Sequence, residues 1–163
     1  MLILRATQLL SPSLGQDNAT QRALLLYIAY NLTATLISVP AGRVGDSWGM
    51  TRILAVGVAA FAFSSLGFGL SGASMPLLGL SFVLAGIGIG CAETAEHAAV
   101  ATLAPATLRG SAFGLLATVQ SFGNLAASAV AGLLWTAFSA EVAFLYVASW
   151  SVIALIVLLL ARR

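Results

Sequence analysis

Five long apolar segments constrain the fold of this chain more than any other feature. They cover about residues 20–40, 52–71, 76–99, 111–135 and 142–161. Each is close to the roughly 20 residues that a helix needs to cross the hydrocarbon core of a bilayer. Only 7% of the residues are charged, whereas a soluble domain carries about 25%. The sequence therefore predicts an all-α integral membrane protein with five transmembrane helices, forming one membrane domain over residues 1–163.

Arginines mark the ends of these segments and indicate an orientation. Five lie on one side of the predicted bundle and two on the other: Arg43, Arg52, Arg109, Arg162 and Arg163 against Arg22 and Arg5. Positively charged short loops stay in the cytoplasm. We therefore expect the loops at 43–52 and 104–110 and the C-terminus to be cytoplasmic, in a multi-pass protein of the inner (plasma) membrane.

Proline, glycine and serine predict where the helices begin and end. The run from Pro40 to Gly49 predicts a tight turn that ends the first segment, and Thr51 is expected to cap the next helix. Ser74 followed by Pro76 is typical of a capped helix start. The opening MLILRATQLL is too short to cross a bilayer and lacks a small-residue cleavage site, so it is interpreted as the end of a helix.

Glycines predict close contacts between helices. Gly86 and Gly90 are four residues apart and therefore share a helix face, which allows a neighbouring helix to approach closely. The Gly-x-Gly-x-Gly run that contains them follows no predicted strand, which argues against a nucleotide site. The segment at 111–135 and its start also contain several glycines among many alanines: Gly110, Gly114, Gly123 and Gly132.

The third segment carries the only acidic residues and the only histidine inside an apolar segment: Glu93, Glu96 and His97. Their spacing places them on one helix face. An ionisable group in the bilayer is costly unless it is paired or faces a wet cavity, so the cluster is a candidate functional site. It can act as a structural clamp, with Glu93 bonded to His97 and Glu96 to Arg109. It can also bind protons or a solute, because histidine titrates near neutral pH.

Polar amides mark two other places on the apolar helices. Gln120 and Asn124 are four residues apart in the fourth segment, and Asn31 lies in the first segment near Tyr27 and Tyr30. Such amides either join helices by hydrogen bonds or line a path for a solute. Both interpretations stay open.

Several functional classes are disfavoured by the sequence. A metal site would need partners for the third-segment cluster, and no other buried acid or histidine is available. A serine hydrolase would need a base for its nucleophile, and His97 is the sole candidate, with Ser111 in an unsuitable loop. The arginines lie singly at segment ends, which disfavours nucleic-acid binding. The single Cys91 excludes an internal disulfide. We expect a protein that is not an enzyme and uses neither cofactor nor metal.

Two loop sequences resemble those of the major facilitator superfamily. Gly42, Asp46 and Gly49 match the family pattern Gly-x-x-x-Asp-basic-x-Gly, although Ser47 occupies the basic position. The loop PATLRG at 105–110 resembles the family's Pro-x-x-x-Arg-Gly sequence. The run from ETAEHAAVATLAP to GLLATVQSFGNLAASAVAGLLW also resembles the last helices of many bacterial members.

The resemblance covers residues from about 20 to the end, and it implies a larger assembly. Members of the family have twelve helices in two halves that rock about a central site. The five segments would then be helices eight to twelve, with MLILRATQLL as the end of helix seven. The resemblance also implies a gating loop on the cytoplasmic side, formed by Gly42, Asp46, Gly49 and Arg109.

The function implied by the resemblance is secondary transport of a small-molecule solute across the lipid bilayer, with protons as the candidate coupling ion. One half has no closed pathway, so we expect the chain to be inactive unless a second chain supplies the missing half. Three alternatives stay open: a truncated, non-transporting membrane scaffold or interaction protein, an intramembrane enzyme, and the product of a truncated or decayed gene.

Overall fold

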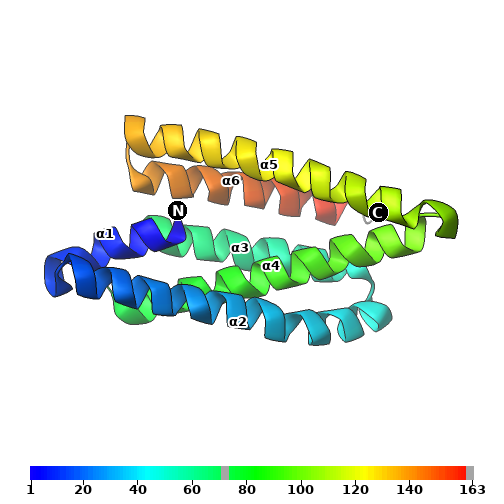
Figure 1. Cartoon of the computed structure of the whole chain (residues 1–163), viewed down its shortest axis with the longest axis horizontal. Coiled ribbons are helices and arrows are strands. Elements are labelled where there is room, and N and C mark those ends of the chain that lie inside the picture. Colours follow the sequence, from blue (N-terminus) through cyan, green and yellow to red (C-terminus); the bar gives the residue numbers. More distant parts are fainter. Residues whose placement is uncertain (71–73, 161–163) are drawn as a thin grey trace.

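Helices make up the whole fold in the computed structural model, which describes residues 1–70 and 74–160. Their bounds are α1 Leu2–Leu14, α2 Gln16–Trp48, α3 Met50–Leu70, α4 Met75–Leu103, the short 3₁₀ turn η1 Ala106–Leu108, α5 Arg109–Ala137 and α6 Ala140–Leu160. No strand occurs in these two ranges. The prediction of an all-α protein is therefore confirmed (Figure 1).

Five helices, α2 to α6, are long and apolar enough to cross a membrane. They correspond to the five predicted segments, and the short α1 precedes them. The expected ends at residues 71 and 161 lie outside the described residues. So does the C-terminal arginine pair.

The five helices lie side by side along the long axis of the molecule (Figure 1). α4 packs between α2 and α3, α3 packs against α6, and α5 packs mainly against α6. The α2–α3 turn, the α4–α5 turn and the end of α6 lie at the same end of the bundle (Figure 1). The segment ends that carry Arg43, Arg52 and Arg109 are thus grouped as the sequence predicted. Which end is cytoplasmic stays a prediction.

The tight turn predicted for residues 40–49 is wrong. α2 continues through Pro40 and ends only at Trp48, so that Gly49 alone separates it from α3. Gly49 has a φ of 93°, a value that favours glycine because a Cβ would be strained there. In hydrocarbon a helix satisfies its own backbone groups, so proline and glycine interrupt helices less readily than they do in water.

The predicted helix starts have mixed outcomes. Ser74 is the N-cap of α4 and Pro76 lies in its first turn, as expected, although the Ser74 side chain makes no capping hydrogen bond. Thr51 does not cap α3, because that helix already begins at Met50. The backbone N–H of Arg52 donates instead to the backbone oxygen of Gly49 at 3.0 Å.

Glycines bring α4 close to both of its neighbours, as predicted for Gly86 and Gly90. A Cβ at Gly86 would lie 2.5 Å from the backbone oxygen of Tyr30, and one at Gly90 would lie 2.6 Å from the backbone oxygen of Ala34, both on α2. Gly88 faces the other way, where a Cβ would lie 3.0 Å from an α3 backbone oxygen. Only glycine permits such close approach of helix backbones.

The glycines of α5 have different surroundings. A Cβ at Gly110, Gly114 or Gly123 would meet nothing within 4 Å in the described structure. Along α5 only Ala131 is buried. α5 therefore presents a long face of small and apolar side chains that no described residue covers.

The N-terminal segment forms α1, which packs into the hydrophobic core. Ala6 and Leu10 are buried in a cluster with Phe68, Phe82 and other apolar side chains. Arg5 is also buried, at 2% exposure. Its Nε donates a hydrogen bond to the Phe68 backbone oxygen at 3.1 Å, and its Nη2 pairs with the Glu141 carboxylate at 2.6 Å. Arg5 thus connects α1 to α3 and α6.

Candidate functional site

The candidate site lies where α4 and α5 pass each other, and it contains a hydrogen bond between two predicted residues. Gln120 Nε2 on α5 donates to the half-buried Glu96 carboxylate on α4 at 2.6 Å. A hydrogen bond to an ionised acceptor is shorter and stronger than one between neutral groups. The structure therefore joins one residue of the acidic cluster, Glu96, to one residue of the amide pair, Gln120.

Glu96 has a different partner from the one expected. The predicted pairing with Arg109 is wrong, because Arg109 is the first residue of α5 and is exposed. Glu96 lies roughly 10 Å before the end of α4, at about 1.5 Å per residue. In an antiparallel neighbour the residue at that depth must also lie well inside the helix. Gln120 satisfies this requirement and Arg109 does not.

His97 is oriented by its own helix and by α5. Its Nδ1 lies 2.7 Å from the backbone oxygen of Glu93, so the predicted bond to the Glu93 carboxylate is replaced by a bond to the main chain. The imidazole also stacks against Phe113 of α5, with ring centroids 5.8 Å apart. Donation by Nδ1 to a carbonyl leaves Nε2 as the ring nitrogen that can accept a proton. Glu93 itself is exposed.

Asn31 does not join this cluster through any hydrogen bond found among the described residues. Its amide donates to the Tyr27 backbone oxygen at 2.8 Å on its own helix, α2. The Tyr27 and Tyr30 rings stack beside it, with centroids 5.3 Å apart. Asn31 is therefore satisfied locally, and its place in a solute path stays a prediction.

The predicted gating residues lie at the end of the bundle that contains the α4–α5 turn. Gly42 packs beside α4, since a Cβ there would lie 3.7 Å from Thr94 Cγ2. Asp46 is exposed in the last turn of α2, and Gly49 ends that helix. Gating by these residues and by Arg109 stays a prediction.

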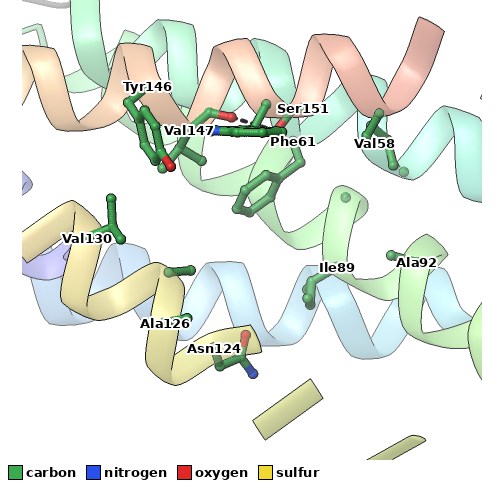
Figure 2. Close-up of a pocket in the computed structure, with 15 residues that line it drawn as sticks. Val58, Phe61, Ile89, Ala92, Asn124, Ala126, Val130, Tyr146, Val147 and Ser151 are labelled. Atoms are coloured by element: carbon green, nitrogen blue, oxygen red, sulfur yellow. Dashed lines mark hydrogen bonds between the residues drawn. The ribbon is translucent and has the colours of Figure 1, made fainter. Parts of the chain in front are cut away.

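A pocket of about 570 Å³ lies between α3, α4, α5 and α6. Figure 2 shows Phe61 pointing into it, with Asn124 on the α5 side and Tyr146 on the α6 side. Ser151 also lines it, but its hydroxyl donates to the Val147 backbone oxygen of its own helix. None of the residues that line this pocket is charged.

A second pocket, of about 640 Å³, lies between the end of α4 and the start of α5. Ile89 and Ala92 line the first pocket, and Val100 and Leu103 line the second. Glu96 falls between these pairs at helical spacing, so all five share one stripe of α4. The Glu96–Gln120 hydrogen bond therefore separates the two pockets. The sequence contains this stripe, but it does not show that α5 leaves space on both sides of the bond.

Five long apolar helices with an ionisable cluster between two of them define a multi-pass membrane protein. The family model of the Major Facilitator Superfamily matches residues 5–163. The chain belongs to this family.

Curated relatives match a part of their own length. An uncharacterized MFS-type transporter of Methanocaldococcus jannaschii is 36% identical over 121 residues, which cover 74% of this chain and 30% of that protein. The gentisate transporter of Corynebacterium glutamicum is 34% identical over 114 residues, covering 69% of this chain and 25% of that protein. An uncharacterized MFS-type transporter of Mycobacterium tuberculosis is 32% identical over 106 residues, covering 65% and 18%. The chain thus spans less than a third of the length of these relatives. No solved structure matches it.

Proposed function

We propose that this chain forms part of a secondary transporter that moves a small-molecule solute across the cell membrane by alternating access. The observation that carries the proposal is the Glu96–Gln120 hydrogen bond between two membrane helices of a Major Facilitator Superfamily chain. Ionisable residues within membrane helices are costly, and they mark pathways for protons and solutes. The orientation is the one that the arginines indicate, with the C-terminus in the cytoplasm.

Glu96 has a geometry suited to coupling protonation to movement. The ionised carboxylate accepts the bond from Gln120, whereas a protonated carboxyl group carries a hydrogen of its own and is a weaker acceptor. Proton binding would therefore loosen the contact between α4 and α5. His97, which stacks on Phe113 of α5, is the titratable residue next to Glu96 in the sequence.

The rest of the transporter comes from outside these 163 residues. In this proposal α2 to α6 are helices eight to twelve of twelve, and Gly42, Asp46, Gly49 and Arg109 form the cytoplasmic gate. The chain alone has no second half to rock against, so it does not transport. A clamp or scaffold function is the alternative, because the same hydrogen bond also holds α5 to α4.

Infrared titration of the purified chain in lipid nanodiscs tests whether Glu96 binds a proton. We expect the protonated-carboxyl absorption, to which all five acidic side chains contribute, to grow as the pH falls and to lose one component in Glu96→Gln. Asp17→Asn is the matched control, because Asp17 is exposed at the start of α2 and distant along the chain from the cluster. The proton-binding role is wrong if the Glu96→Gln spectrum equals that of the unmodified chain at every pH.

Transport itself is tested in proteoliposomes. The chain alone should take up no solute from a panel that includes gentisate, which a relative is named for. Co-reconstitution with the portion of that relative that this chain does not match should restore uptake driven by a pH gradient. Glu96→Gln should then reduce the initial rate at least tenfold and Asp17→Asn should leave it unchanged. Robust uptake by the isolated chain would contradict the requirement for a second half, and equal rates for both variants would favour the clamp.

A further inference from the structure

The pocket between α3, α4, α5 and α6 is lined by two polar side chains that have no partner in the described part of the chain. Neither the Asn124 amide nor the Tyr146 hydroxyl takes part in a hydrogen bond there. The polar side chains next to them are satisfied, since Gln120 donates to Glu96 and Ser151 donates to its own helix. An unpaired amide or hydroxyl in an apolar environment costs free energy. Asn124 and Tyr146 are therefore available to a ligand.

The two groups lie at opposite ends of the pocket. Asn124 lies thirteen residues before the end of α5, and Tyr146 lies six residues after the start of α6. Because α5 and α6 form an antiparallel hairpin (Figure 1), the two positions are offset along the bundle by about 10 Å, at 1.5 Å per residue. Figure 2 shows the Tyr146 hydroxyl directed from α6 towards the α5 wall. A ligand that uses both groups is therefore elongated, with a polar atom at each end.

Aromatic rings line the pocket between its polar ends. Trp150 lies one helical turn beyond Tyr146 in the direction of Asn124, and the two rings form a T-shaped pair with centroids 6.3 Å apart. Phe61 points into the pocket from α3 (Figure 2). Aromatic side chains pack favourably against other aromatic rings, in offset or edge-to-face arrangements. The middle of the pocket therefore favours an aromatic ligand.

Small residues on α3 and α4 leave the space that this ligand would fill. Gly57 and Gly88 both line the pocket, and a Cβ on Gly57 would lie 2.8 Å from the Gly88 backbone oxygen. The two helices thus form one closely packed wall. The pocket volume of about 570 Å³ is within the range of about 300–1,000 Å³ that is typical of small-molecule sites. None of the lining residues is charged, and an unpaired charge would be costly to bury there, so the ligand is uncharged.

We propose that this pocket binds an elongated, uncharged aromatic compound with a hydroxyl or amide group at each end, held by Asn124 at one end and by Tyr146 at the other. Both side chains donate and accept hydrogen bonds, so they match groups that do the same. That this compound is the transported solute rests on the proposed function, whereas its binding does not. Asn124 lies one helical turn from Gln120, so the compound would lie next to the Glu96–Gln120 hydrogen bond.

Titration with 2,6-dihydroxynaphthalene, a two-ring probe with a hydroxyl at each end, tests the proposal on the full chain in lipid nanodiscs at constant pH. Trp48→Phe and Trp135→Phe leave Trp150 as the only tryptophan, so its fluorescence reports on the pocket. We expect saturable quenching. Asn124→Leu and Tyr146→Phe should each weaken binding at least tenfold, because each leaves one end of the probe without a partner. Naphthalene, which has no hydroxyl, should also bind at least tenfold more weakly.

Two substitutions on α2, outside the pocket, are the matched controls. Asn18→Leu and Tyr27→Phe should leave the affinity within twofold of that of the unmodified chain. The thermal unfolding midpoint without probe separates ligand binding from a structural role. Because the Asn124 amide and the Tyr146 hydroxyl have no hydrogen-bond partner among the described residues, Asn124→Leu and Tyr146→Phe should not lower this midpoint. A lower midpoint in both variants would overturn the proposal in favour of a structural role.

Three binding results would also overturn the proposal. Quenching that does not saturate would show that the probe only dissolves in the lipid, and equal affinity of both pocket variants would show that the polar ends do not bind it. Tighter saturation by phenyltrimethylammonium would show a cation site instead. Saturable, variant-sensitive binding supports the proposal even if the reconstituted transporter does not carry the probe. That last result would count against the proposed function alone.

Discussion

Gly86→Leu should prevent α2 and α4 from packing and should lower the thermal unfolding midpoint more than any other single change considered. A Cβ at this position would lie 2.5 Å from the Tyr30 backbone oxygen and 2.9 Å from Thr33 Cβ. Backbone atoms cannot move aside as a flexible side chain can, so the two helices must separate. Overpacking usually costs about 1–3 kcal/mol, and we expect the upper end of that range or more. Circular dichroism melting in detergent measures the effect.

Gly123→Leu is the matched control for this substitution. It introduces the same side chain in another membrane helix, at a position where nothing lies within 4 Å of an added Cβ. The helix propensity of leucine is about 1 kcal/mol better than that of glycine, so the midpoint should stay constant or rise. The close-packing interpretation fails if both variants melt at the same temperature.

Glu141→Ala should destabilise the chain more than Arg5→Met, although Arg5 is the more deeply buried partner. Removing Glu141 leaves the Arg5 charge in a site where its side chain is 3% exposed. Removing Arg5 leaves a carboxylate that is 48% exposed and can be hydrated. Breaking a buried pair costs about 3–5 kcal/mol. Because Glu141 is partly exposed, we expect Glu141→Ala to lower the free energy of unfolding by less, about 2 kcal/mol. Denaturant unfolding of both variants measures the difference.

The double variant distinguishes the ion pair from a general packing effect. Once Arg5→Met has removed the buried charge, Glu141→Ala should add almost nothing to the loss of stability. Arg22→Met, at an exposed position on α2, is the control and should be neutral. Additive losses in the double variant would show that Glu141 stabilises the fold independently of Arg5.

Arg5 stabilises two helix ends at once, which explains why its removal is also costly. α3 ends at Leu70, so the Phe68 carbonyl is among the last four, which lack a partner within the helix. Arg5 Nε donates to that oxygen. Glu141 lies in the first turn of α6, where the helix dipole favours a negative charge. The pair thus connects the negative end of α3 to the positive end of α6.

The sequence predicted the membrane helices and the close approach at Gly86, because hydropathy and small-residue spacing are local properties of the chain. It did not predict that α2 continues through Pro40. Proline and glycine often end a helix in water-soluble proteins, but they do so less readily in a membrane, where the backbone cannot form hydrogen bonds to water instead. The partners of Arg5 also escaped prediction. Phe68 is 63 residues away along the chain, and no local pattern marks it.

The residues of the candidate site are a prediction from the sequence, and their connections became visible only in the structure. The spacing of Glu96 and His97 placed them on one face, and that of Gln120 and Asn124 placed them on another helix. Their pairing depends on how far α5 overlaps α4, which is set by the η1 turn and by where α5 begins. Charge complementarity, which the sequence shows, favours Arg109 as the partner of Glu96, whereas the helix overlap that selects Gln120 is a property of the fold.

Because Gly49 is the only residue between α2 and α3, the two helices have no slack between them. A linker of several residues would let the two helix ends separate, but a single residue holds them together. A displacement of the α2 end near Asp46 should therefore also displace the start of α3, and both helices pack against α4.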